Sequence, residues 1–112
     1  MINGTYTGVI QGTNGLQEAG SVTISGSTVF GETTRYALFG QLATLPQNRL
    51  IIRLSAKPYR VEDDHFLFDG QSFDVELFGE LRGEQISLEG TVEGDIPIEL
   101  RVVLRLRRPL AS

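Results

Sequence analysis

Apolar residues alternate with polar ones along almost the whole chain, and no segment keeps the period of an amphipathic helix. Successive side chains of a strand point to opposite faces of a sheet, so a period of two predicts strands with one buried face. Residues typical of turns separate the alternating segments. We therefore expect eight strands, over residues 4–11, 21–25, 28–32, 35–42, 50–57, 72–81, 84–92 and 97–107.

Three hairpins can be aligned from their turn residues. Gly26 and Ser27 suit a two-residue turn, which places Ile24 opposite Val29. Arg82 and Gly83 suit a second two-residue turn, which would place Leu77 opposite Leu88 and Val75 opposite Gly90. A three-residue loop over 94–96 would pair Glu93 with Pro97.

These alignments keep the apolar residues of each strand on one face, as a buried interior requires. The predicted inward residues are Tyr6, Val22, Ile24, Tyr36, Leu38, Leu42, Leu50, Ile52, Leu54, Phe73, Val75, Leu77, Leu81, Ile86, Leu88, Val92, Ile98, Leu100, Val102, Leu104 and Leu106. The 112 residues fit one domain over 1–112, and we expect an all-β, eight-stranded antiparallel up-and-down barrel of lipocalin-like type, with room for a short helix in the connection 58–71.

Glycine recurs on the predicted inner face, in the pattern apolar, x, Gly, x, apolar around Gly40, Gly79 and Gly90. Two interpretations stay open. Inward glycines allow the sharp bending that closes a small barrel. They also leave volume for an apolar, acyl-chain-like ligand, because eight-stranded barrels can hold one small molecule. Such a cavity would be lined by Tyr6, Tyr36, Leu38, Leu54, Val75, Leu77, Leu88, Leu100 and Val102.

Composition limits the function. The net charge is −4, from 14 acidic and 10 basic residues, which disfavours direct binding of nucleic acid. There is no cysteine, no apolar run long enough to span a membrane and no recognisable signal peptide, so we expect a cytoplasmic protein.

The sequence offers no convincing catalytic or cofactor site. The sole histidine, His65, follows Glu62, Asp63 and Asp64, but these lie in a predicted loop with no second histidine for a zinc site. No serine or threonine has a histidine near it in sequence to act as a base. We expect no enzymatic activity, no bound metal and no cofactor.

Four apolar side chains are predicted to point outward, namely Phe39, Ile51, Phe78 and Val103. Apolar residues gathered on a surface indicate contact sites. Two interpretations stay open: the apolar segment 66–68 of the long connection folds over one group, or these side chains are the interface with another protein.

The chain also resembles a known family in several short segments. These are 3–8 (NGTYTG), the hairpin 20–31, 36–42 (YALFGQL), 66–70 (FLFDG), 73–79 (FDVELFG), 86–90 (ISLEG) and 104–106 (LRL). Together they resemble the negative regulators of bacterial type III secretion. That resemblance implies a cytoplasmic, homodimeric lipocalin-like barrel that holds a transcriptional activator inactive by binding the protein and not the DNA, and whose interior accepts an apolar ligand.

One departure from the family affects the site. The family carries a short acidic run in the loop between the fourth and fifth strands, whereas residues 43–48 contain no acid here and the acidic run 62–64 lies elsewhere. No partner-binding residue is therefore carried over. We expect a regulatory protein-binding module that dimerises, with a small carrier of an apolar ligand as the alternative.

Overall fold

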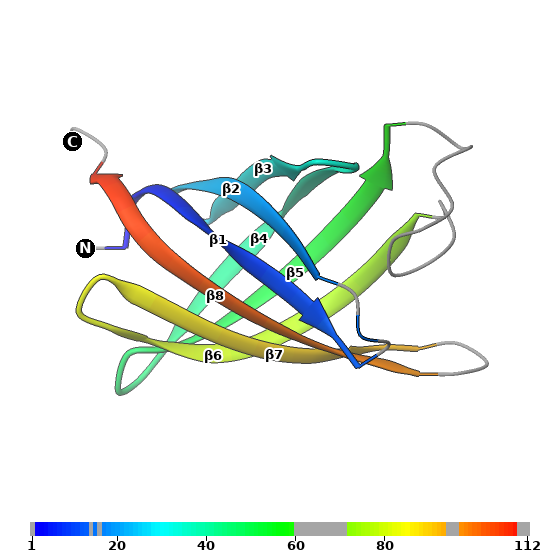
Figure 1. The fold of residues 1–112 in the computed structure, drawn as a ribbon. Coiled ribbons are helices and arrows are strands. Elements are labelled where there is room, and N and C mark those ends of the chain that lie inside the picture. Colours follow the sequence, from blue (N-terminus) through cyan, green and yellow to red (C-terminus); the bar gives the residue numbers. More distant parts are fainter. Residues whose placement is uncertain (1, 14, 16, 60–71, 94–96, 110–112) are drawn as a thin grey trace.

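The computed structural model describes residues 2–13, 15, 17–59, 72–93 and 97–109, and these form a closed antiparallel barrel (Figure 1). Each strand pairs with the next along the chain, and β1 closes the barrel against β8. The strands are β1 (Gly4–Gly12), β2 (Gln17–Ser25), β3 (Thr28–Thr33), β4 (Tyr36–Leu45), β5 (Arg49–Pro58), β6 (Phe73–Arg82), β7 (Gln85–Val92) and β8 (Ile98–Pro109). The predicted all-β, eight-stranded up-and-down fold is thus confirmed.

Two further predictions concern the long connection after β5 and the absence of a membrane span. The predicted short helix falls in 60–71, which lies outside the described residues, as does the acidic run with His65. The described part of the chain contains no helix long and apolar enough to cross a membrane.

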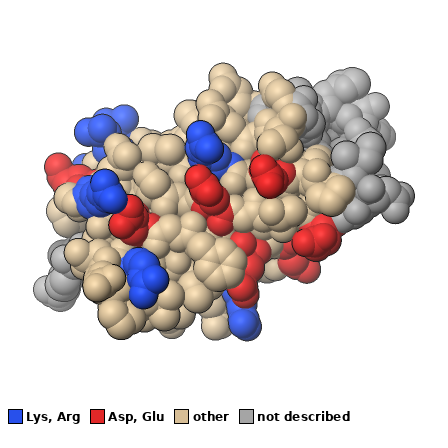
Figure 2. Space-filling view, turned by 90° about the horizontal axis from the view of Figure 1, so that it is seen from below, with Lys and Arg blue, Asp and Glu red and all other residues tan. Residues whose placement is uncertain are grey.

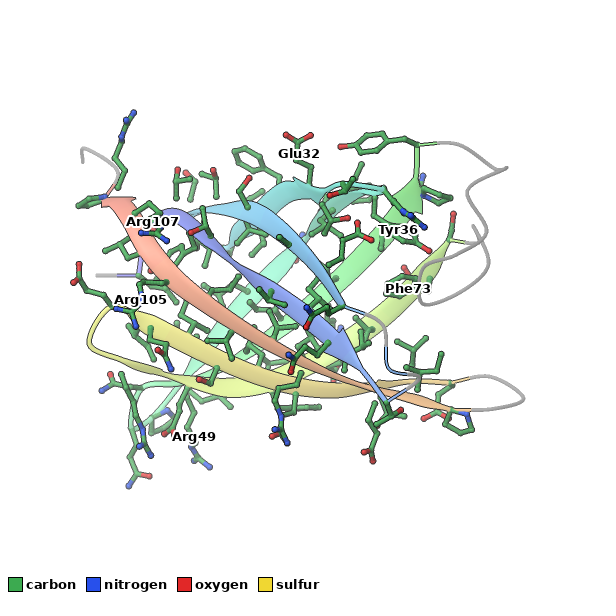
Figure 3. All side chains as sticks on the ribbon, viewed as in Figure 1. Glu32, Tyr36, Arg49, Phe73, Arg105 and Arg107 are labelled. Carbon is green, nitrogen blue, oxygen red and sulfur yellow. The ribbon has the colours of Figure 1, made fainter. Side chains whose placement is uncertain are left out.

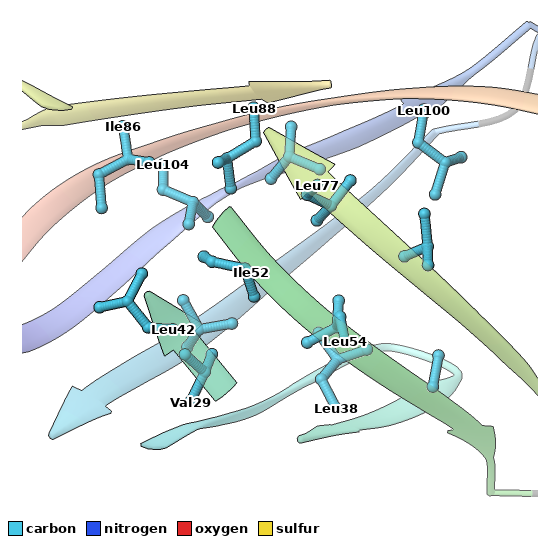
Figure 4. Close-up of a cluster of buried hydrophobic side chains, with 14 of the residues drawn as sticks. Val29, Leu38, Leu42, Ile52, Leu54, Leu77, Ile86, Leu88, Leu100 and Leu104 are labelled. Carbon is cyan, nitrogen blue, oxygen red and sulfur yellow. The ribbon is translucent and has the colours of Figure 1, made fainter. Parts of the chain in front are cut away.

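The interior is filled by the inward faces of all eight strands, as Figure 4 shows for Leu38, Ile52, Leu77 and Leu88. The predicted inward residues are all buried or packed against the core, with Phe73, Leu81 and Leu106 only partly buried. Val29 and Ala56 complete the core although the predicted set omitted them; both are about 1% exposed.

The turn residues explain why two of the three predicted hairpin registers are correct and one is wrong. Ile24 pairs with Val29 around Gly26, whose φ is +63°, as predicted, and Val92 pairs with Ile98 as the three-residue loop requires. The β6–β7 prediction was wrong by two residues. The turn is Gly83 and Glu84, not Arg82 and Gly83, so Arg82 pairs with Gln85.

This shift changes neighbours but not faces. Gly79, not Leu77, lies opposite Leu88. Leu77 and Leu88 still point inward, because a register shift of two residues leaves each side chain on the same face of the sheet. The glycine with positive φ, Gly83 at +60°, occupies the first position of the turn as Gly26 does in β2–β3. On the outer face, Phe78 therefore lies beside Glu89 of β7. On the other side of β6, Glu76 lies opposite Arg53 of β5.

The inward glycines mark places where neighbouring strands approach too closely for a side chain. A Cβ placed on Gly79 would overlap the carbonyl oxygen of Ser87, and one on Gly40 would overlap that of Arg53. Gly8 and Gly31 are in the same situation. The space beside these glycines is therefore occupied by backbone, which supports the curvature interpretation at these positions.

A β-bulge interrupts the pairing that closes the barrel. Thr5 pairs with Arg108 and the next residue, Tyr6, pairs with Leu106, which leaves Arg107 as an extra residue on β8. In the sequence, two arginines in succession, Arg107 and Arg108, interrupt the alternation at this place. Without the bulge the alternation along β8 would turn Arg108 inward, whereas here Arg108 lies on the outer side with Thr5.

Candidate protein-contact surface

Large apolar side chains are exposed on the outer wall of the barrel at more places than the sequence suggested. Phe78 is 50% exposed, Phe39 43% and Val103 41%, whereas Ile51 is half-buried. The prediction missed others. The alternation could have identified Val9 and Phe30, which lie in predicted strands, but not Leu45 and Tyr59, which lie in segments predicted to be loops. The missed residues are Val9, Phe30, Leu45 and Tyr59.

Strand pairing brings three of the four predicted contact residues onto one side of the barrel. Ile51 lies directly opposite Phe78 across β5 and β6. Phe78 and Val103 line one open hollow of about 640 Å³, together with Leu45. We call this region the Phe78 hollow. It is centred on the outer surface of β6, β7 and β8.

Charged residues surround the Phe78 hollow. Its rim includes Arg49, Glu80, Glu89 and Arg101. Figure 2, which views the barrel from the side of β6 and β7, shows acidic and basic groups distributed among uncharged surface. An apolar centre with a polar, solvent-exposed rim is the usual anatomy of a protein interface.

Most of these charges are paired. Arg53 Nε lies 3.0 Å from Glu76 Oε2, Arg82 Nη2 lies 2.8 Å from Glu80 Oε1, and Arg101 Nε lies 3.7 Å from Glu89 Oε1. All six side chains are at least two-fifths exposed, so each pair contributes under about 1 kcal/mol to stability. Their effect is to keep the rim close to neutral.

The fourth predicted residue, Phe39, belongs to a different patch. It lies directly opposite Phe30 across β3 and β4, and the Lys57 ammonium lies 5.4 Å from its ring centroid. Phe39 is four residues from Ala43, the β4 residue that pairs with Ile51, a separation of about 13 Å along a strand. The structure therefore places Phe39 apart from Ile51 and Phe78. We call Phe30 and Phe39 the Phe30–Phe39 patch.

The cavity found among the described core residues is small. All nine predicted lining residues are buried, but the cavity that five of them share (Leu38, Leu54, Leu77, Leu88 and Val102) measures about 30 Å³ and has a wholly apolar lining. That is room for about one or two water molecules.

Two buried polar side chains, one near each end of the barrel, form hydrogen bonds with backbone groups. At the end that carries the β2–β3 turn, the Tyr6 hydroxyl donates to the Ile2 carbonyl at 2.6 Å, and burial raises the pKa of Tyr6. At the other end, Glu18 Oε1 accepts the Arg35 backbone N–H at 2.8 Å. These hydrogen bonds, which the sequence pattern did not indicate, explain how the Tyr6 hydroxyl and the Glu18 carboxylate can be buried.

The fold and surface define the class: a closed up-and-down β-barrel with apolar patches on its outer wall. Searches found no match to this chain among known family models or among curated proteins. The resemblance to the type III secretion negative regulators therefore stays an expectation from the sequence segments.

Proposed function

We propose that this protein is a regulatory module that dimerises and acts by surface contact with another protein, such as a transcriptional activator. One observation carries the proposal. Phe78 lies half exposed beside Ile51, in a hollow whose rim carries four charged residues, three of them in ion pairs. Aromatic side chains are enriched at interface centres, and charged residues are confined to the rim.

A module that both dimerises and captures a partner needs two separate surfaces. The Phe78 hollow and the Phe30–Phe39 patch meet this need, because Phe39 lies several residues along β4 from the Ile51 row. We assign one of them to the second copy and the other to the partner. The net charge of −4 favours a basic partner, such as a DNA-binding protein, over the DNA itself.

The alternative expectation was a carrier of an acyl chain. No feature of the described interior favours it, because the cavity of about 30 Å³ is far smaller than such a ligand. The glycines that suggested spare volume instead lie against backbone of the adjacent strand. Binding of an acyl chain would require core side chains to move.

The test is a pair of charge substitutions with a matched control. Phe78→Asp and Phe39→Asp each place a carboxylate at the centre of one patch. Gln41→Asp adds the same charge at an exposed outward position of β4 between them. Size-exclusion chromatography with light scattering reports the oligomeric state, and pull-down from an extract of the native cell reports partners.

We expect one phenylalanine variant to lose self-association and the other to lose partner capture, while Gln41→Asp keeps both. Circular dichroism should be the same for all three, because the altered side chains lie outside the core. If both phenylalanine variants keep the oligomeric state and the partners of the parent protein, the contact proposal is wrong.

A further inference from the structure

Charge is unevenly distributed along the barrel. We call the end that carries the turns β2–β3, β4–β5 and β6–β7 the terminal end, because β1 begins there and β8 ends there (Figure 1). Among the described residues, this end carries five arginines and only two glutamates. They are Arg49, Arg82, Arg105, Arg107 and Arg108, against Glu80 and Glu84.

The opposite end has the reverse charge, with five acids against two bases among the described residues. These are Glu18, Glu32, Asp74, Glu93 and Glu99, against Arg35 and Lys57. The terminal end is thus a basic region on a protein whose net charge is −4. That contrast calls for a physical account of the arginines there.

Three of these arginines are gathered by the β-bulge of β8. Arg105 pairs with Thr7, Arg108 pairs with Thr5, and the extra residue Arg107 lies between them. All three are exposed, and Figure 3 shows Arg105 and Arg107 along the same stretch of β8. We call Arg105, Arg107 and Arg108 the arginine cluster.

The arginine cluster has no acidic partner in the part of the chain that the structure describes. The ion pairs there involve Arg53, Arg82 and Arg101 instead. The neighbouring strand β1 contains no charged residue at all. The carbonyl of Glu84, in the β6–β7 turn, accepts the Leu106 backbone N–H at 2.8 Å, but the ion pairs among the described residues do not include the Glu84 side chain.

The contacts that the cluster does make leave its donors available. Arg107 Nε donates to the Thr7 hydroxyl at 2.6 Å, which orients the guanidinium while its terminal NH₂ groups stay free. Arg105 Nη2 makes only a long contact of 3.5 Å with Gln85 Oε1. Unpaired arginines beside hydroxyl groups are suited to bind carboxylates in a bidentate manner.

We propose that the arginine cluster is a docking site for an acidic segment of a protein partner, with carboxylates at alternate positions. Alternate residues of an extended segment are about 6.6 Å apart, which matches the spacing of Arg105 and Arg107 along β8. The proposal rests on the proposed function, since the occupant is a protein, but it concerns another face than the Phe78 hollow.

The size of the cluster favours a short acidic segment over nucleic acid. Along β8 the next outward residues are Val103, which is uncharged, and Arg101, which is already paired with Glu89. A nucleic acid would find no continuous basic track beyond the three arginines, and the affinity of such complexes depends on many phosphate contacts. The net negative charge of the protein adds long-range repulsion.

The experiment uses a synthetic probe, so it does not require the native partner. A fluorescently labelled peptide of alternating glutamate and serine is titrated with the full chain at low ionic strength, and anisotropy is measured. The test variant carries Arg105→Gln, Arg107→Gln and Arg108→Gln. The control carries Arg53→Gln, Arg82→Gln and Arg101→Gln, which lowers the net charge by the same amount at arginines that are already paired.

We expect the test variant to lose affinity by about tenfold or more and the control by less than about threefold, since only the first removes free donors. Binding should also weaken as salt rises. Equal losses in both variants, or no loss in the test variant, would overturn the proposal. Tighter binding of single-stranded DNA of equal charge would do so too.

Two further measurements distinguish a protein partner from a second copy of the chain as the occupant, and distinguish this proposal from the proposed function. If the peptide does not bind but the test variant loses self-association in sedimentation, the occupant is the acidic end of a second copy and the proposal is wrong. Phe78→Asp should leave peptide binding unchanged. Suppose that Phe78→Asp changes neither the oligomeric state nor the captured partners, while peptide binding still depends on the arginine cluster. That result would count against the proposed function alone.

Discussion

Gly79 of β6 lies opposite Leu88 of β7, at a point where the two strands come so close that Gly79 has no space for a Cβ. The atom in the way is the backbone carbonyl oxygen of Ser87, which cannot rotate aside as a side chain would. Strand curvature at this point therefore depends on glycine.

We expect Gly79→Ala to lower the free energy of unfolding by about 2 kcal/mol or more, in the range of overpacked sites. Ser87→Ala, an exposed change at the residue whose carbonyl Gly79 approaches, should stay within about 0.5 kcal/mol of the parent. Urea denaturation followed by circular dichroism measures both. A Gly79→Ala protein of parental stability would show that the strands can move apart, and would revive the cavity interpretation.

Tyr6 gives a prediction for alkaline pH. Burial raises the pKa of Tyr6 above its ordinary value of 10.0. Since the folded-state pKa is the higher one, the contribution of Tyr6 to stability is complete below about pH 10 and is lost as pH rises through the folded pKa. The stability of Tyr6→Phe should fall less between pH 9 and pH 11 than that of the parent, by urea denaturation at each pH.

At neutral pH the same variant should be less stable by about 1 kcal/mol, because it loses the hydrogen bond to the Ile2 carbonyl. Tyr59→Phe is the control. Tyr59 is exposed and donates to Glu32 at 2.9 Å, a contact that also raises the pKa of Tyr59. A parent and a Tyr6→Phe protein with the same pH profile would contradict the role given to burial.

Glu18 offers a prediction about the β3–β4 turn. Its side chain is 8% exposed and accepts the Arg35 backbone N–H. Glu18→Ala leaves that donor only its longer contact of 3.3 Å with the Thr33 hydroxyl and should cost about 0.5–1.5 kcal/mol, measured by thermal or urea unfolding. Glu18→Gln keeps an acceptor oxygen and should cost clearly less. Equal losses would indicate that side-chain volume, and not the hydrogen bond, matters at this position.

The exposed ion pair between Arg53 and Glu76 should matter little to stability. A double-mutant cycle with Arg53→Ala and Glu76→Ala should give a coupling energy below about 1 kcal/mol that decreases at high salt. The measurement is urea denaturation of the four proteins of the cycle. A larger coupling would mean that the charged residues on the outer face of β5 and β6 stabilise the barrel and are not only a solvated surface.

Much of the fold could be predicted because it depends on local patterns. The alternation of apolar residues identified the inner face, and Gly26 with its positive φ fixed the β2–β3 register. At the β6–β7 turn the sequence allowed Gly83 in either position of a two-residue turn. The wrong choice moved the register by two, and the inner face survived because the side-chain period is also two.

The sites were harder to predict because they depend on lateral relations between strands. Pairing Ile51 with Phe78, and Phe39 with Phe30, requires registers that the sequence did not supply. The bulge at Arg107 coincides with two arginines in succession, which interrupt the alternation, but the sequence does not show how β8 aligns with β1. The surroundings of the arginine cluster could therefore be recognised only from the structure.

The pairing of β1 with β8 has a consequence for synthesis of the chain. Every other pairing joins strands that are neighbours in sequence, whereas this one joins Gly4 to Pro109. The nascent chain can form its hairpins in order as they leave the ribosome, but two unpaired strand edges persist until the final strand has emerged. Open edges promote association between chains, so a ribosome that stalls before β8 is complete would release an aggregation-prone product.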